Sequence, residues 1–391
     1  MFDVMGNKGM LPKAAIKSQP KDFVVEEITL KGTLIEVGKT YNFDNTQKGD
    51  FLVFALEKKD TDTFIAIKNI AKALKISDAR ITVAGIKDKK AITAQRASAY
   101  KIKKEQIEKI KPNNIKITPL NYGKKVYLGA LDANRFTITV RNLSESPESI
   151  KKHIENKDKT LNGFFPNFFG EQRFGSSRPV SHIVGKHILC GDFRKAVETY
   201  VSMPGKTDSK ELNSIRKNAF KDLDAAYRKF PFNCVYEKDI LLHLIENKDD
   251  FAGALRTIPL GLRKMFVSAY QSEIFNRALF ELIDDKKVTS KTKIPLPGYL
   301  FSSRIFSSVE DDVVENILKD DGVVPEMFRV AKMPELSSEG EKRDVFSQYN
   351  DFSILEVSKD ELNTDKTKAV LRFTLKKGSY ATIFLRQFFE I

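Results

Sequence analysis

The sequence has only two cysteines, Cys190 and Cys234, among its 391 residues. Two thiols support neither a disulfide framework nor a cysteine-rich zinc site, and they are typical of a protein that folds in a reducing compartment. No run approaches the roughly 18 consecutive apolar residues that a membrane-spanning helix needs. Residues 1–20 also lack the continuous apolar segment of a signal peptide. We therefore expect a cytoplasmic protein.

The motifs of several common enzyme classes are missing as well. We find no Walker P-loop, no dinucleotide-binding glycine fingerprint after a strand and no His-Glu-x-x-His. His182 and His187 are not at the i, i+4 spacing of a helical metal pair. No Gly-x-Ser-x-Gly elbow occurs, although a Ser-His-Asp arrangement assembled by the fold is left open. These absences disfavour nucleotide hydrolysis, dinucleotide redox chemistry and zinc catalysis, and they leave an acidic residue that acts without a cofactor.

Acidic residues are outnumbered: 52 Asp and Glu stand against 66 Lys and Arg, which gives a formal net charge of +14. Such an excess favours a polyanionic partner, with RNA or DNA first and an anionic membrane surface second. A generally lysine-rich proteome would raise the charge without any partner. The 41% of apolar residues is typical of a globular protein, and the length predicts two domains.

The order of predicted elements changes twice along the chain. A mixed α/β pattern ends near residues 157–166, which are rich in turn residues, and a mostly helical pattern then runs to residues 337–343. Strand-like segments return after that. This order predicts one domain inserted into another, and the alternative is two sequential domains whose second ends in a small sheet. The predicted strands are 23–28, 51–56, 91–100, 126–132, 135–141, 352–357 and 369–375, and the predicted helices are 60–75, 180–189, 192–201, 209–228, 251–256 and 262–283.

One turn stands out chemically. Residues 80–84 form a strand-like run that turns at Gly85, and the turn places Asp88 among Lys87, Lys89 and Lys90. We expect the carboxylate to stay ionised, because nearby positive charge stabilises its charged form. An ionised carboxylate at the end of a strand fits either a salt-bridged surface loop or a nucleophile. On these residues alone, the surface loop is the better interpretation.

Two further stretches have more than one interpretation. Residues 101–125 carry eight lysines with Glu105 and Glu108, which fits a solvated face or a basic rim beside an RNA site. Residues 167–175 combine three phenylalanines with two glycines, Gln172 and Arg173. Phenyl rings can stack on bases and arginine can pair with phosphate. An aromatic hinge packed between domains fits that stretch equally well.

Six stretches resemble, in order along nearly the whole chain, motifs of the archaeal-type TruD family of tRNA pseudouridine synthases. The two most specific are Gly-Ile-Lys-Asp-Lys-Lys-Ala-Ile-Thr-Ala-Gln at 85–95, which matches the catalytic loop, and Gln-Arg-Phe-Gly at 172–175. The poorest match lies in the helical region between the motifs. The six stretches are residues 22–27, 85–95, 129–136, 166–175, 268–276 and 378–382.

The resemblance implies an α+β pseudouridine synthase catalytic domain with a mixed, mostly antiparallel sheet, interrupted by a largely helical inserted TRUD domain. The implied bounds are 1–165 and 345–391 for the catalytic domain and 166–344 for the insertion. The implied reaction is the isomerisation of one uridine of tRNA, typically at position 13, to pseudouridine. It needs neither cofactor nor metal, and we expect a monomer with tRNA as its partner and no membrane association.

The resemblance also implies site residues. Asp88 falls on the nucleophilic aspartate of the family, and Lys17 on the basic residue that pairs with it. Phe23, Asn134 and Phe136 fall on positions that line the pocket of the target uridine. Without the resemblance, the two phenylalanines are core residues, Lys17 is a surface charge and Asn134 is a turn residue before a strand.

Two other functions fit parts of the pattern. A non-catalytic RNA-binding or RNA-chaperone protein on the same scaffold would share the basic charge and the aromatic residues, but it would gain nothing from a buried acid that faces phosphates. A phosphatase with an aspartate nucleophile is disfavoured, because Asp88 is followed by two lysines instead of a second carboxylate for a metal.

Overall fold

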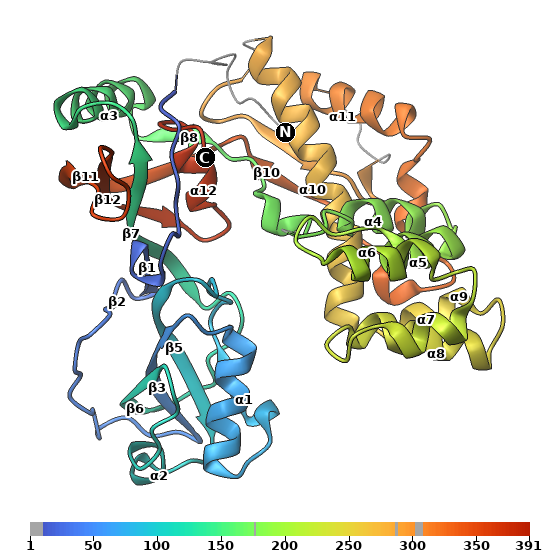
Figure 1. Cartoon of the computed structure of the whole chain (residues 1–391), viewed down its shortest axis with the longest axis horizontal. Coiled ribbons are helices and arrows are strands. Elements are labelled where there is room, and N and C mark those ends of the chain that lie inside the picture. Colours follow the sequence, from blue (N-terminus) through green and yellow to red (C-terminus); the bar gives the residue numbers. More distant parts are fainter. Residues whose placement is uncertain (1–10, 176, 286–287, 302–307) are drawn as a thin grey trace. The chain divides into compact units, whose positions relative to one another are not determined.

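The computed structural model describes residues 11–391 except 176, 286–287 and 302–307. The described residues form two compact units (Figure 1). Residues 11–166 and 347–391 form the first, here called the sheet unit, and residues 167–346 form the second, the helical unit. The chain thus leaves the sheet unit once and returns to it. No helix in the described ranges is long and apolar enough to cross a membrane.

The sheet unit is built on one ten-stranded sheet with the order β6-β3-β5-β1-β7-β12-β11-β8, to which β2 and β4 are added at β1 and β5. β1 pairs with β5 in parallel and with β7 antiparallel. β3 pairs antiparallel with β5 and β6, as β12 does with β7 and β11. The strands are β1 Phe23–Thr29, β2 Leu34–Ile35, β3 Phe51–Lys59, β4 Ile81–Val83, β5 Ile92–Tyr100, β6 Ile115–Gly123, β7 Leu131–Leu143, β8 Phe164–Pro166, β11 Phe346–Lys359 and β12 Thr367–Lys376.

Helix α1 (Thr63–Leu74) covers one face of this sheet (Figure 1). Asp62 caps it, because its carboxylate accepts hydrogen bonds from the backbone N–H groups of the first turn. The helix predicted at 60–75 is confirmed, and Phe64 in its first turn is 57% exposed. Ala66 and Ile70 are buried in one cluster with Leu52 and Phe54 of β3. The other helices of the unit are α2 Lys104–Glu108, α3 Pro147–Leu161 and α12 Ala381–Leu385.

The segment before β7 is a loop, so the predicted strand at 126–132 is wrong. Gly129 adopts a left-handed φ of 90° and its N–H donates to the carbonyl of Ala84 at 2.7 Å. Val126 and Ala130 are apolar because they pack on Ala84 in a small core cluster, not because they belong to a strand. The strand predicted at 135–141 is confirmed as part of β7.

The helical unit is organised around α10 (Leu260–Asp284), which packs on α4 (Ser181–Leu189) and α11 (Val309–Asp320). Gly185 makes the approach of α4 possible, since a Cβ there would lie 2.0 Å from the carbonyl oxygen of Phe266. The remaining elements are α5 Phe193–Ser202, α6 Lys210–Asn218, α7 Leu223–Lys229, α8 Val235–Glu246, α9 Phe251–Arg256, β9 Lys293–Leu296 and β10 Glu341–Asp344.

The single helix predicted at 209–228 is wrong. The chain forms α6 and α7 instead, and the break lies between Asn218 and Leu223. Asp222 begins the second helix, because its carboxylate accepts a hydrogen bond from the N–H of Ala225. A strong N-cap residue inside an apolar pattern therefore starts a new helix rather than continuing the old one.

Candidate active site

The turn that carries Asp88 connects β4 and β5, and it is fixed by side chains from β3, α1 and β5. Lys58 of β3 donates from Nζ to the carbonyl oxygen of Asp88 at 2.7 Å. Thr63, the first residue of α1, bonds with its hydroxyl to both the N–H and the C=O of Lys87, at 3.1 and 3.2 Å. Gln95 of β5 donates to the carbonyl of Gly85 at 2.9 Å. The backbone around Asp88 is therefore held rigidly, which suits a reacting group.

Asp88 and Lys17 form an ion pair. Lys17 Nζ lies 2.5 Å from Asp88 Oδ1, and the two side chains are 21% and 22% exposed. Lys17 adopts a φ of +56°, a left-handed conformation that is uncommon outside glycine and is often found at functional sites. The segment before it is fixed by reciprocal backbone hydrogen bonds between Ala15 and Arg141, at 2.8 and 2.9 Å. The pair is thus partly shielded from water yet still open to a ligand.

Phe23 and Phe136 lie beside this ion pair. Lys17 Nζ is 4.1 Å from the centroid of the Phe23 ring, a cation–π contact. The Phe23 ring meets that of Phe136 edge to face at 6.1 Å, and Phe136 stacks on Phe373 of β12 at 5.5 Å. Phe23 is 2% and Phe136 7% exposed. The rings therefore form a packed wall next to Asp88, of which a bound base would meet only a small part.

Asn134 of β7 lies on the same face of the sheet as Phe136, two residues away on one strand. Its side-chain oxygen Oδ1 accepts a hydrogen bond from Lys87 Nζ at 2.5 Å. Lys87 Nζ in turn lies 3.5 Å from Oε2 of Glu27, which faces Asn134 across the β1–β7 pair. The structure thus brings all five predicted site residues to one place, linked through Lys87 and the turn at Asp88.

Burial shifts the pKa values of the charged side chains beneath the turn. It lowers the pKa of Lys58 to about 8, against the opposing effect of Asp88. Burial also lowers the pKa of Lys87 and raises that of Glu27, and in each case the charge of the other residue opposes the shift. The amine groups that support the turn are consequently weaker bases than exposed lysines.

Comparison with known proteins supplies the family. The model of the family described as tRNA pseudouridine synthase D (TruD) matches residues 7–293 and 286–388. This chain belongs to the TruD family. A protein of Methanosarcina acetivorans named "Probable tRNA pseudouridine synthase D" is 36% identical, over 96% of this chain and 92% of its own length. One of Methanocaldococcus jannaschii, named "Probable tRNA pseudouridine synthase D 1", is 34% identical over 96% and 95%.

A solved structure agrees with these relatives. The crystal structure of a Methanosarcina mazei protein, described as "Putative tRNA pseudouridine synthase D (TruD)", matches with a TM-score of 0.76 and 33% identity over 98% of this chain and 94% of that one. The family and the α+β fold class implied by the motifs are therefore confirmed. The TruD family is one of tRNA pseudouridine synthases, which are isomerases, so the enzyme class is confirmed too. The roles of the five site residues stay predictions.

Four residues support the turn that carries Asp88: Glu27, Lys58, Thr63 and Lys87. Sequence reasoning gave no role to the first three, and it treated Lys87 only as a positive charge near Asp88. The sequence could have pointed to two of them, because Glu27 and Lys87 lie within stretches that resemble family motifs. Thr63 looked like an ordinary first-turn residue of a helix, and Lys58 like a charge at the end of a strand. Lys58 is in fact only 1% exposed. Their roles depend on contacts between residues far apart in the sequence.

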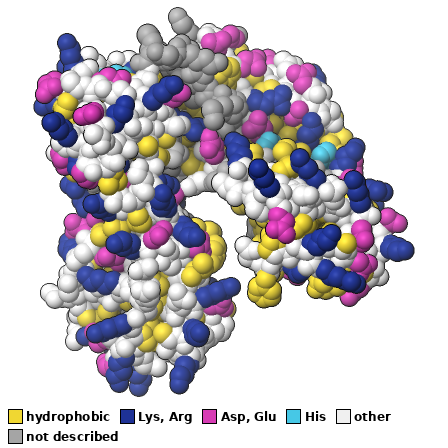
Figure 2. All heavy atoms as spheres, viewed as in Figure 1, with side chains coloured by type: hydrophobic (Ala, Val, Ile, Leu, Met, Phe, Trp, Pro, Cys, Tyr) yellow, Lys and Arg dark blue, Asp and Glu magenta, His cyan; other side chains and the backbone are white. Residues whose placement is uncertain are grey.

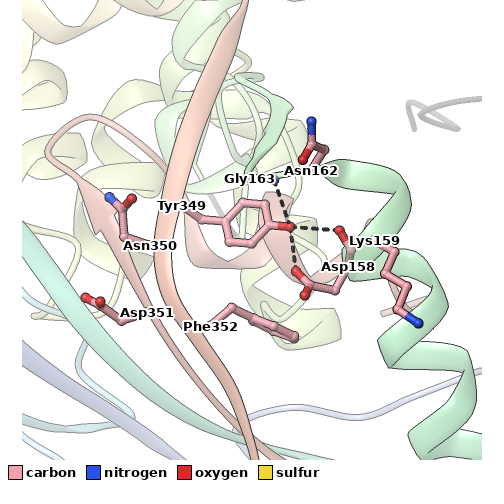
Figure 3. Close-up of a pocket in the computed structure, with 8 residues that line it drawn as sticks. All are labelled: Asp158, Lys159, Asn162, Gly163, Tyr349, Asn350, Asp351 and Phe352. Carbon is pink, nitrogen blue, oxygen red and sulfur yellow. Dashed lines mark hydrogen bonds between the residues drawn. The ribbon is translucent and has the colours of Figure 1, made fainter.

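A separate hollow lies in the same unit, at the C-terminal end of α3 (Figure 3). The hydroxyl of Tyr349 donates to Asp158 Oδ1 at 2.6 Å and accepts from the N–H of Gly163 at 3.3 Å. These hydrogen bonds join α3 to β11 and satisfy the tyrosine hydroxyl within the protein. None of the five predicted site residues lines this hollow, so we assign it a structural role.

Proposed function

We propose that this TruD-family protein isomerises the uridine at position 13 of tRNA to pseudouridine, with Asp88 as the reacting carboxylate and Lys17 as its basic partner. The observation that carries the proposal is the ion pair between these residues, at 2.5 Å, on the turn whose sequence matches the family's catalytic loop. In this proposal residues 1–165 and 345–391 form the catalytic domain, which agrees with the sheet unit to within two residues at each boundary, and residues 166–344 form the inserted TRUD domain.

The reaction is an internal rearrangement. The bond from uracil N1 to C1′ of the ribose breaks, the base turns, and a bond from C5 to C1′ forms. The proton that C5 loses is balanced by the proton that N1 gains, so no oxidant, reductant or other reactant enters. A carboxylate can assist by attack on C1′, by attack on C6 of the base, or by removal of the C2′ proton to give a glycal. Each route needs the carboxylate of Asp88 ionised and placed beside the sugar and base.

The environment of Asp88 supports such a role. Lys17 keeps a positive charge next to a carboxylate that is only 22% exposed, and opposite charge offsets the cost of partial burial. The target uridine has to leave its base stack to reach the site, which costs a few kcal/mol. Contact with the wall of Phe23 and Phe136 would recover part of that cost, since stacking on an aromatic ring contributes ~1–3 kcal/mol per base.

The experiment is a carbodiimide and primer-extension map of unmodified tRNA transcripts, without added metal or nucleotide. Wild-type protein should produce one new stop at the target uridine, and Asp88→Asn should produce none while its tRNA affinity stays within about three-fold, because only the reacting group has changed. Asp78→Asn is the matched control: it removes the same charge from an exposed residue of the same unit, and it should keep full activity.

Four outcomes separate the candidates. A stop with both wild type and Asp88→Asn would contradict the role of Asp88. A stop at another uridine would contradict position 13 alone. No stop with wild type, together with tight tRNA binding, would favour the non-catalytic RNA-binding protein. Loss of tRNA binding with Asp88→Asn would mean that the role of Asp88 is not purely chemical.

A further inference from the structure

Three charged or polar side chains form a chain of contacts beneath the catalytic turn: Glu27, Lys87 and Asn134. Glu27 on β1 and Asn134 on β7 are direct partners across the antiparallel pair, so their side chains leave the same face of the sheet next to each other. Lys87 reaches both, with Nζ 2.5 Å from Asn134 Oδ1 and 3.5 Å from Glu27 Oε2. The chemistry of Asp88 uses none of these contacts directly.

The contact with Lys87 decides which end of the Asn134 amide faces the site. A lysine ammonium has three donors and no acceptor, so the group that faces it has to be the amide oxygen. The opposite orientation would press the NH2 donors of the amide against the donors of Lys87. The NH2 group of Asn134 therefore points away from Lys87, and among the described residues none accepts a hydrogen bond from it.

The Lys87 side chain has little freedom to move away from the side-chain amide of Asn134. Its side chain is 5% exposed and that of Glu27 is fully buried, so the two charges keep each other in place. Glu27 is fixed as well: its Oε1 accepts the backbone N–H of Arg96 at 3.2 Å, and the Arg96 guanidinium lies 3.8 Å away. Thr63 holds the backbone of Lys87 at both its N–H and its C=O. Asn134 itself is only half-buried, so its NH2 end remains within reach of a ligand.

We propose that Lys87, held by Glu27, is a positioning residue that selects uridine over cytidine: it fixes the Asn134 amide with its NH2 group toward the base, where it donates to the C4 carbonyl oxygen of uracil. Cytosine carries an amino group at that position, which is a donor, so its approach would place donor against donor. The inference rests on the proposed function and names the base that this same site accepts.

The size of the effect follows from the general cost of a buried polar group without a partner. Such a mismatch lowers affinity on the order of 10- to 100-fold. Without Lys87, the amide can turn over and offer Oδ1 to the cytosine amino group. The preference between the two bases should then shrink, whatever the change does to tRNA binding in general.

The test measures binding in an Asp88→Asn background, so that no turnover occurs. Two tRNA transcripts that differ only in uridine or cytidine at the target position are titrated by fluorescence anisotropy, and the ratio of their Kd values is the readout. We expect the background variant to prefer uridine on the order of 10- to 100-fold and the further change Lys87→Met to reduce this to about three-fold or less. Lys90→Met removes an exposed lysine of the same turn and should leave the ratio unchanged.

A second variant tests the proposal without touching the turn. Asn134→Asp replaces the amide by a carboxylate, which can still accept from Lys87 but presents only acceptors to the base. The preference should then reverse in favour of cytidine. A uridine preference that survives both Lys87→Met and Asn134→Asp would overturn the inference, as would a background variant that binds both transcripts equally. These results are distinct from failure of the proposed function, in which wild-type protein would form no pseudouridine at all.

Discussion

Lys17 and Asp88 are 71 positions apart in the sequence and meet in an ion pair of 2.5 Å. Neither side chain is held by the pair alone. Lys17 lies over the ring of Phe23 and follows a segment hydrogen-bonded to β7, whereas Asp88 sits on a turn fixed by Lys58 and Thr63. Both charges are therefore placed before a substrate arrives, so little of the binding energy is needed to arrange them.

Replacing Lys17 by Met should lower kcat by about 100-fold, the size found when one preorganised electrostatic group is removed from an active site. Lys21→Met, an exposed lysine in the same segment, should stay within about two-fold of wild type. Single-turnover assays of pseudouridine formation at saturating enzyme measure both. An active Lys17→Met enzyme would show that Asp88 does not depend on this charge.

Replacing Lys58 by Met should change the pH dependence of stability. Burial lowers the pKa of Lys58 to about 8 in the folded protein, below the ordinary value of about 10.4 in the unfolded chain. Below pH 8 both states carry the proton, and the folded state bears the cost of the buried charge. As the pH rises from 8 toward 10.4, the unfolded chain binds more protons than the folded one, so wild type gains stability relative to Lys58→Met.

Urea unfolding at several pH values between 7 and 10 measures this difference. Lys59→Met is the matched control, because Lys59 is the exposed next residue of the same strand. The difference in unfolding free energy between wild type and Lys59→Met should not vary over this pH range. If the difference in unfolding free energy between wild type and Lys58→Met is also constant from pH 7 to 10, Lys58 has an ordinary pKa in the folded protein.

Local residue composition was enough to place several elements. Helix α9 was predicted at its observed bounds, and β5 and α10 nearly so. The sequence predicted only the first part of strand β3, because the sheet is covered on both faces there. Leu52 and Phe54 are fully buried on one side, and Val53 is 6% exposed on the other. Where both faces are apolar, alternation does not show which way the next polar residue points. For that reason the inward orientation of Lys58 was not predicted.

The candidate site likewise has a part that the sequence predicted and a part that it did not. Lys17, Phe23, Asp88, Asn134 and Phe136 were named from motif resemblance, which carries their roles but not their contacts. The contacts that support the turn were not predicted, because they join residues far apart in the sequence: Glu27 meets Lys87 only after β1 has paired with both β5 and β7. Sequence spacing along one strand contains no information about that pairing.

Replacing Arg141 by Met should destabilise the sheet unit by about 3–5 kcal/mol, the usual result of removing one partner from a buried ion cluster. Arg141 is 2% exposed and pairs with Asp22 at 2.8 Å and Asp360 at 2.7 Å. Both carboxylates are buried and would lose their cation. Glu361→Gln removes a partner whose side chain is 46% exposed, so its effect should be much smaller. Urea midpoints with unchanged m-values measure both, and equal losses would contradict the argument.

Replacing Lys109, Lys111 and Lys125 by Gln tests whether residues 101–125 meet RNA. All three side chains are exposed, and Lys and Arg side chains gather around α2 on the face shown in Figure 2. If they contact phosphates, tRNA affinity should fall and the slope of log K against log salt should flatten by about one unit for each lost contact, because fewer counterions are released.

The control for this triple change replaces Lys151, Lys152 and Lys159 of α3 by Gln. These lysines are also exposed, and the net charge of the protein changes by the same amount. Its slope should stay near that of wild type if α3 lies away from the RNA. Equal flattening by both triple variants would assign the effect to overall charge. An unchanged slope in the first variant would make residues 101–125 a solvated face with no part in tRNA binding, because a phosphate contact cannot be lost without a change in counterion release.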